Sequence, residues 1–182
     1  MDFYEAVAKR QSVRKYKSDL IPENGLNRIL ESFQRAPSWA NVQPWELILV
    51  TDPEIKSKLQ TTLPNGNPAM KAIVDAPVLV CIIGIPDTSG WYKGKPVTGR
   101  GDWMLFDVGI AAEHITLAAA AEGLGTVHVG LFDYEKAGKI LCIPSNRTVV
   151  ELMPLGFPDH EPKPVGRKSI EAFVFRNKYG QK

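Results

Sequence analysis

Cations and small hydrogen-bonding side chains are concentrated in one segment near the amino terminus, residues 9–16, with the sequence KRQSVRKY. Arg10, Ser12 and Arg14 alternate along it, so an extended backbone would point all three side chains the same way. Two guanidinium groups flanking a hydroxyl suit a phosphate, because Arg offers paired N–H donors and Ser adds a short O–H donor. The alternative is a solvated basic turn, since runs of charge are commonly exposed.

A second polar constellation lies in residues 36–45, with the sequence APSWANVQPW. Pro37 and Pro44 restrict the backbone, whereas the amides of Asn41 and Gln43 can pair with the donor and acceptor edge of a planar heterocycle. This combination predicts a stiff recognition surface. The alternative is a turn in which both amides bond only the local backbone.

Composition limits the classes of protein to consider. The chain has 182 residues, of which 44% are hydrophobic, and a formal net charge of +2. We therefore expect a single domain spanning residues 1–182. The charge is too small for a general nucleic-acid binder, so no nucleic-acid partner is expected. Residues 1–10 do not resemble a signal peptide, and no apolar run reaches the roughly 20 residues of a membrane span, so we expect no membrane partner and a cytoplasmic location.

The two cysteines, Cys81 and Cys142, each lie in an apolar run. Such positions predict buried free thiols rather than a disulfide. None of His114, His128 and His160 lies at ligand spacing from either cysteine, so no metal site is expected.

The elements that position these residues follow from apolar periodicity and from start and stop signals. A long helix at 102–122 is rich in small residues, which predicts burial on nearly all sides. Residues 85–101 form a loop of Gly, Pro, Lys and Asp, and loops of this length are commonly functional. Strands are expected at 46–50, 78–84, 126–129 and 149–155, and helices at 2–11, 22–36, from residue 52, at 69–74, at 102–122 and at 133–140. The C-terminal segment 169–175 is of mixed type.

Five blocks in order resemble the nitroreductase superfamily, over nearly the whole chain. They are Arg10–Tyr16, Ala36-Pro37-Ser38 to Asn41 with Gln43-Pro44-Trp45, Asp75-Ala76-Pro77, Gly123-Leu124-Gly125-Thr126, and Gly130-Leu131-Phe132-Asp133. The resemblance implies an α+β fold, a nitroreductase-like three-layer sandwich with a mixed, mainly antiparallel sheet around a long central helix. It also implies a homodimer with FMN at the subunit interface.

The family's first flavin-binding segment matches Arg10, Gln11, Ser12 and Arg14. The resemblance implies that Arg10 and Ser12 hold phosphate or ribityl oxygens of FMN and that Arg14 approaches the N1 and O2 edge of the ring. A fixed cation there would stabilise the negative charge that hydride transfer creates, so Arg14 serves as electrostatic support. No side chain acts as a nucleophile in this interpretation, because the flavin carries the chemistry.

Other blocks complete the implied flavin site. One segment comes from the opposite subunit, a turn brings its backbone toward N5 and O4, and C-terminal cations close on the phosphate. In the same order these are Pro37, Ser38, Trp39 and Asn41; then Val129, Gly130 and Leu131; then Arg167 and Lys168. A glycine at 130 would let backbone N–H groups approach a flat ring, although it also suits an ordinary turn at the end of a strand.

Two features depart from the common family pattern. An asparagine and a basic residue often precede the Asp-Ala-Pro block, and here Lys71 and, with less support, Asn67 are the candidates. Trp39 replaces a small residue, so its ring either narrows the space above the flavin or packs against the dimer partner. In residues 85–101, aromatic and basic side chains would favour a flat acceptor or donor phosphates, and the alternative is a mobile surface loop.

The implied activity is ping-pong electron transfer. NADH or NADPH would reduce FMN at N5, and a nitroaromatic, a quinone or a similar acceptor would then take the electrons. Alternatives are another flavin reaction on this fold, such as dehalogenation, dehydrogenation or flavin fragmentation, or a non-catalytic FMN-binding module. A further alternative is an α+β domain that binds an unrelated anion at its basic turn.

Overall fold

A four-stranded antiparallel sheet forms the centre of the protein, which we describe from a computed structural model covering residues 1–182. The strands lie in the order β1 (Trp45–Val50), β2 (Val78–Gly84), β6 (Thr148–Gly156) and β5 (Gly125–Thr126). Every residue of β2 is buried. A continuous apolar strand of this kind can be covered on both faces, and here it lies between two strands and two helical layers.

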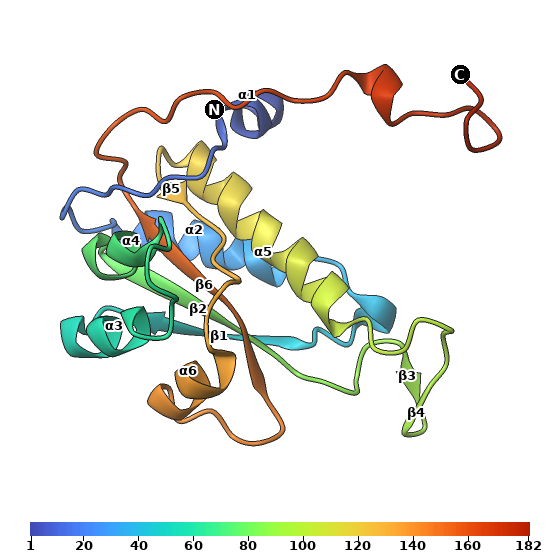
Figure 1. The fold of residues 1–182 in the computed structure, drawn as a ribbon, viewed down its shortest axis with the longest axis horizontal. Helices are drawn as coiled ribbons and strands as arrows, with labels where there is room; N and C mark the ends of the chain where they lie inside the picture. Colours follow the sequence, from blue (N-terminus) through green and yellow to red (C-terminus); the bar gives the residue numbers. More distant parts are fainter.

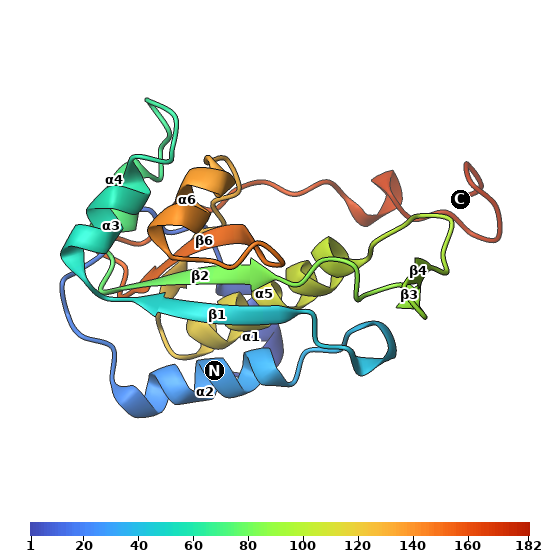
Figure 2. The ribbon, with the colours of Figure 1, turned by 90° about the horizontal axis from the view of Figure 1, so that it is seen from below.

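Helices cover both faces of the sheet (Figures 1 and 2). One face carries α1 (Phe3–Lys9), α2 (Glu23–Gln34) and α5 (Met104–Ala121), and the other carries α3 (Pro53–Gln60), α4 (Met70–Asp75) and α6 (Tyr134–Ile140). Each layer has its own apolar core against the sheet. The expected three-layer α+β sandwich is confirmed, with α5 as its longest helix.

Three of the helices begin where an aspartate can cap them. Asp2 and Glu5 form a capping box at α1. The side chain of Asp52 accepts from two N–H groups of α3, and Asp133 accepts from the N–H of Lys136 in α6. These contacts satisfy backbone donors that a helix leaves free at its first turn. The local sequence therefore determines where these helices start.

The prediction that the long central helix is buried on nearly all sides is wrong for the single chain. Leu105 and Phe106 of α5 are 64% and 58% exposed, and Gly109 on the same side is also exposed. The reason is that the sheet, α1 and α2 cover only part of its circumference. By length and composition alone α5 could cross a membrane, but half of its residues are buried inside the molecule, as in a core helix.

Some elements differ from expectation. The strand predicted at 126–129 is reduced to β5, and beyond it Val129 forms only an isolated bridge to Leu152. Cys81 is buried as expected, but Cys142 is exposed, because it follows α6 in a left-handed turn with φ of 56°. Residues 85–101 contain a two-stranded hairpin of β3 (Trp91–Tyr92) and β4 (Lys95–Pro96).

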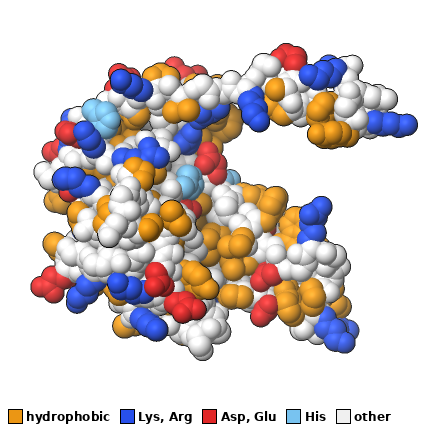
Figure 3. Space-filling view, in the orientation of Figure 1, with side chains coloured by type: hydrophobic (Ala, Val, Ile, Leu, Met, Phe, Trp, Pro, Cys, Tyr) orange, Lys and Arg blue, Asp and Glu red, His pale blue; other side chains and the backbone are white.

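Two short 3-10 helices complete the fold, η1 (Trp39–Asn41) and η2 (Ile170–Ala172). After β6 the chain leaves the sheet and runs past α1, so that the C-terminus stands away from the rest of the molecule (Figure 1). A deep hollow separates this segment from the hairpin below it (Figure 3).

Candidate cofactor-binding site

The basic segment after α1 is held extended at the edge of the sheet. Ser12 forms a parallel bridge with Thr126, and the N–H of Val13 donates to the carbonyl of Thr126 at 2.8 Å. Val13 is buried against Gly125, where any larger side chain would collide with it. The glycine of the Gly-Leu-Gly-Thr block is therefore required for this close approach of two backbones.

The extended backbone gives the predicted alternation. Val13 points into the protein, whereas Ser12 and Arg14 on either side of it are exposed. Neither Ser12 nor Arg14 forms a side-chain hydrogen bond, and Arg14 forms no ion pair. Arg10 is largely covered, and its Nε lies 4.0 Å from Oε1 of Glu113. The segment therefore presents a hydroxyl and a guanidinium group with unused donors, as an anion site requires.

Gln11 shows a second unused polar group. Its Oε1 atom is buried and has no hydrogen-bond partner. The residue lines a cavity of about 230 Å³ that is also lined by Arg10, Thr126 and Glu161. A buried acceptor without a partner costs roughly 1–3 kcal/mol, so a ligand that donates an O–H group here would stabilise the protein.

The turn at residues 129–131 begins next to β6. Backbone bonds of 3.1 Å in both directions join Val129 to Leu152, and the side chain of Leu131 is exposed. Gly130 has no positive φ, and a Cβ atom built on it would meet nothing within 4 Å. Neither backbone conformation nor packing within the chain requires glycine at 130, which is consistent with a surface kept free for a ligand.

Of the two candidates before the Asp-Ala-Pro block, Asn67 is the one that contacts this turn. Its Nδ2 donates to the carbonyl of Leu131 at 3.3 Å, while its Oδ1 accepts from the N–H of Ala69. Lys71 instead forms an ion pair of 2.7 Å with Asp75, one turn along the same short helix. The structure thus connects Asn67 to the predicted site and leaves Lys71 on the surface.

The connector 36–45 is a strained turn around η1. Ala40, Asn41 and Gln43 all have positive φ, a conformation that is uncommon for residues other than glycine. Ser38 Oγ accepts from the N–H of Gln43 at 2.9 Å, and Gln43 Nε2 donates to the carbonyl of Asn41 at 3.3 Å. The side chain of Gln43 therefore bonds the local backbone, whereas the side-chain amide of Asn41 has no hydrogen-bond partner.

Trp39 belongs to an aromatic cluster at the start of α5. Its ring centroid lies 6.2 Å from that of Trp103, which in turn packs edge-on against Phe106 at 5.2 Å. Exposed Phe106 extends this aromatic surface outward. Within one chain, Trp39 thus packs on α5 and leaves part of its ring uncovered.

The two groups of predicted residues lie at opposite ends of α5. The pairing of Val13 with Thr126 follows the carboxyl end of the helix, whereas η1 packs on its first turn (Figure 1). An 18-residue helix is about 27 Å long. One chain alone therefore does not bring Arg10–Arg14 and Pro37–Asn41 to the same place.

The two C-terminal cations, Arg167 and Lys168, form no hydrogen bond or ion pair with the basic segment or with the connector 36–45. Arg167 donates only to the carbonyls of Val165 and Gly166 in its own segment, and Lys168 forms no hydrogen bond or ion pair. Both side chains are exposed.

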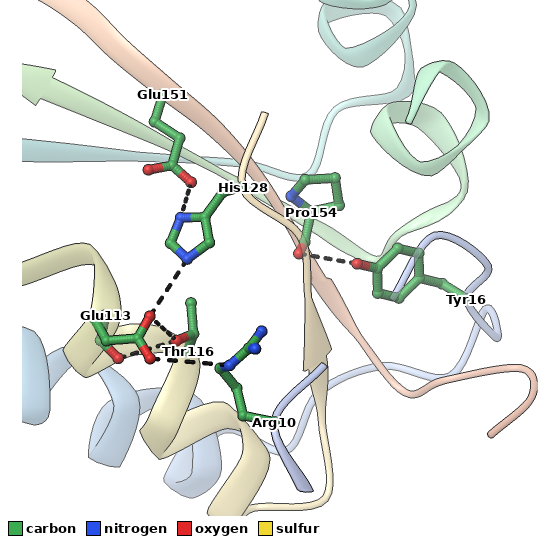
Figure 4. A network of polar contacts seen from close by, with 7 residues as sticks. All are labelled: Arg10, Tyr16, Glu113, Thr116, His128, Glu151 and Pro154. Atoms are coloured by element: carbon green, nitrogen blue, oxygen red, sulfur yellow. Dashed lines mark hydrogen bonds and ion pairs between the residues drawn. The ribbon is translucent and has the colours of Figure 1, made fainter. Parts of the chain in front are cut away.

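A polar network joins Arg10 to the sheet through α5, and the residue patterns in the sequence did not predict it (Figure 4). His128 Nδ1 lies 2.6 Å from Oε1 of Glu151, and its Nε2 lies 3.5 Å from Oε2 of Glu113. Hydrogen bonds to Glu113 and Glu151 raise the pKa of His128 to about 9. The same histidine lowers the pKa of Glu113. His128 lies between buried Val127 and Val129, and this alternation was the available signal that it faces α5.

Comparison with known proteins identifies the family. The profile of the Nitroreductase family matches residues 7–157. The chain belongs to the nitroreductase family. A putative NADH dehydrogenase/NAD(P)H nitroreductase from Methanothermobacter thermautotrophicus is 34% identical to it over 166 residues, which cover 89% of this chain and 80% of the relative.

Other members of the nitroreductase family show its range. A nitroreductase family protein from Clostridium novyi is 34% identical, with a TM-score of 0.79 over 100% of this chain and 96% of the other. An FMN-dependent nitroreductase from Clostridium difficile is 25% identical, with a TM-score of 0.80 and coverage of 97% and 99%. An iodotyrosine deiodinase from Thermotoga neapolitana is 26% identical and covers 88% and 90%. The resemblance inferred from the five sequence blocks is confirmed.

Proposed function

We propose that this nitroreductase-family protein is an FMN-dependent oxidoreductase that passes electrons from NADH or NADPH to nitroaromatic, quinone or similar acceptors. The whole chain, residues 1–182, would form one FMN-binding domain. Support comes from the family and from similarity to an enzyme described as an FMN-dependent nitroreductase.

The observation that carries the proposal is the set of unused polar groups beside β5. Ser12 and Arg14 are exposed without partners, and Gln11 holds a buried acceptor without a donor. A flavin mononucleotide carries the matching groups, namely a phosphate for cations and hydroxyls, and ribityl hydroxyls for the Gln11 amide. The residues present therefore fit this cofactor.

When bound, FMN supplies the hydride chemistry, and the protein supplies position and electrostatics. Arg10, Gln11 and Ser12 would bind the phosphate and ribityl oxygens. Arg14 would stabilise negative charge at the pyrimidine edge of the ring, because a fixed cation in a partly dry site acts strongly on such charge. The bare backbone at Gly130 would allow its N–H to face the ring.

We further propose that the site is completed by a second copy of the chain. Pro37, Ser38, Trp39 and Asn41 lie at the far end of α5 from the basic segment, so a partner must supply them. The exposed side of α5 offers Leu105, Phe106 and Gly109 for that contact. A partner would also give exposed Leu131, Arg167 and Lys168 surroundings that the single chain does not provide, whereas Val129 is already buried and paired with Leu152. For Lys71 the ion pair with Asp75 argues against a role in holding the cofactor.

The loop with β3 and β4 would border the acceptor. Tyr92 is exposed, and Lys93 lies 5.3 Å from the centre of its ring. A reducing cytoplasm is the compartment we propose, where NADH and NADPH are available and free thiols such as Cys142 stay reduced.

One spectroscopic experiment tests the proposal. Purified protein supplied with FMN is expected to retain a yellow chromophore, which bleaches under anaerobic NADH or NADPH and returns when a quinone or nitroaromatic is added. Protein that retains no FMN would refute the flavin assignment. Bound FMN that neither nicotinamide bleaches would refute the donor assignment and leave a binding module.

Reductive dehalogenation is the second candidate, favoured by the similarity to a protein named iodotyrosine deiodinase. Release of iodide from an iodinated tyrosine by the reduced protein distinguishes the two. Faster turnover with the halogenated substrate than with quinones or nitroaromatics would select this alternative.

A further inference from the structure

His128 is held between two carboxylates that come from different elements. Glu151 on β6 faces Nδ1 at 2.6 Å, and Glu113 on α5 faces Nε2 at 3.5 Å (Figure 4). A neutral imidazole has a single N–H and could donate to only one of them, whereas the protonated ring can donate to both. The geometry therefore selects the charged ring.

Glu113 is shared among three groups. Its Oε2 accepts from Thr116 Oγ1 at 2.9 Å and faces His128, while its Oε1 faces Nε of Arg10. The distance of 4.0 Å to Arg10 is too long for a hydrogen bond. Arg10 thus lies beside Glu113 without a hydrogen bond to it and keeps its N–H donors for another acceptor.

The charges in this network balance only while His128 is protonated. Arg10 and His128 then offset Glu113 and Glu151. The other charged residues that line the cavity beside Arg10 are Lys9, Glu161 and Met1, which carries the amino-terminal ammonium group. A neutral His128 leaves the network with one net negative charge close to the place where Arg10 would meet a phosphate.

We propose that protonated His128 is a positioning residue of the flavin site, which engages Glu113 so that the guanidinium of Arg10 remains free to bind an anionic group of the cofactor. This inference rests on the proposed FMN binding. When His128 loses its proton, Glu113 has no cation except Arg10 to pair with and competes with the phosphate for it. The hydrogen bonds that protonated His128 donates to both carboxylates raise its pKa to about 9, so this change is expected near that pH.

The test is the pH dependence of FMN binding to the FMN-free full-length protein, followed by quenching of flavin fluorescence. The wild-type dissociation constant is expected to be constant near neutral pH and to rise about five- to tenfold through about pH 9. His128→Gln should bind FMN about five- to tenfold more weakly at neutral pH and lack this rise. Any change in affinity with pH that remains in His128→Gln comes from other groups, including FMN itself.

Glu113→Gln and the double variant separate positioning from folding. Glu113→Gln removes the competing carboxylate, so its FMN affinity should not change through pH 9. Adding Glu113→Gln to His128→Gln should restore the lost affinity, a rescue that a merely structural role of His128 does not predict. Riboflavin lacks the phosphate and should show no step near pH 9.

The outcomes distinguish the two proposals. Suppose that the wild type binds FMN and that His128→Gln keeps both the wild-type FMN affinity and the step near pH 9. This result would overturn the role of His128 and leave the proposed function standing. The same holds if the double variant binds no better than His128→Gln. If the wild type binds no FMN at any pH, both proposals fail.

Discussion

The carboxylate of Asp107 on α5 accepts a hydrogen bond from the backbone N–H of Trp39 in η1 at 3.0 Å. The same oxygen accepts from the hydroxyl of Ser89, in the loop before β3. Asp107 is 2% exposed, so its bond with Ser89 is buried, while the bond from Trp39 is partly buried. One buried carboxylate thus joins the turn that we assign to the partner's flavin site, the loop that we place beside the acceptor, and the first turns of the central helix.

Removal of this carboxylate is expected to loosen η1. Asp107→Ala leaves the Trp39 N–H and the Ser89 hydroxyl without their acceptor, which should lower the free energy of unfolding by roughly 1–3 kcal/mol. Asp107→Asn keeps an acceptor oxygen and is the matched control. Urea unfolding and FMN titration measure the two effects. An alanine variant as stable as the asparagine variant would show that these bonds do not hold η1.

Gly130 offers a test of the flavin contact that leaves folding undisturbed. Its conformation suits any residue and its surroundings are open, so Gly130→Ala should change the stability of the FMN-free protein by less than about 0.5 kcal/mol. If the ring lies against this backbone, the added methyl group should weaken FMN binding about tenfold, equivalent to about 1.4 kcal/mol. Gly99→Ala is the control, because Gly99 in the 85–101 loop is equally open. Equal FMN affinity in wild type and both variants would remove Gly130 from the site.

The fold was predictable where short segments determine it. Asp52 followed by Pro53 starts α3, and Asp133 starts α6, because capping needs only neighbours in the sequence. The alternation of Ser12, Val13 and Arg14 likewise follows from an extended backbone. The exposed side of α5 could not be predicted in this way, since apolar composition shows that a surface favours burial but not which element covers it.

The site was predictable only as separate pieces. The five sequence blocks indicate candidate residues, but the separation of these residues along α5 depends on the path of the whole chain. The contact of Glu113 with His128 arises because α5 and the 127–129 segment lie side by side, and no spacing in the sequence encodes it. The sequence does not show which of Asn67 and Lys71 turns toward Leu131, and in the structure Asn67 does so.

The exposed side of α5 provides a test of assembly. Gly109 is exposed, and a Cβ atom there would meet nothing within 4 Å in the single chain. Gly109→Arg should therefore fold but keep a second copy from approaching, giving a monomer in sedimentation velocity and loss of FMN binding. Gly109→Ala should stay dimeric and gain up to about 1 kcal/mol, because Ala favours helix over Gly. An arginine variant that remains dimeric would place the interface elsewhere, and a wild-type monomer that binds FMN would refute the shared site.

The network around His128 also predicts how stability depends on pH in the absence of any ligand. The pKa of His128 is raised from 6.5 to about 9 on folding, so its ion pairs stabilise the folded state fully below about pH 6.5 and are lost as the pH rises to about 9. Glu113 stays ionised throughout that interval, because its pKa is lowered. The side chain of His128 is 43% exposed, and allowing for screening by water leaves a change on the order of 1–2 kcal/mol. Urea unfolding of FMN-free protein at about pH 6 and pH 9.5 measures it, with His128→Gln as the control. If the wild type and His128→Gln lose the same free energy of unfolding across this interval, His128 is not the group that titrates.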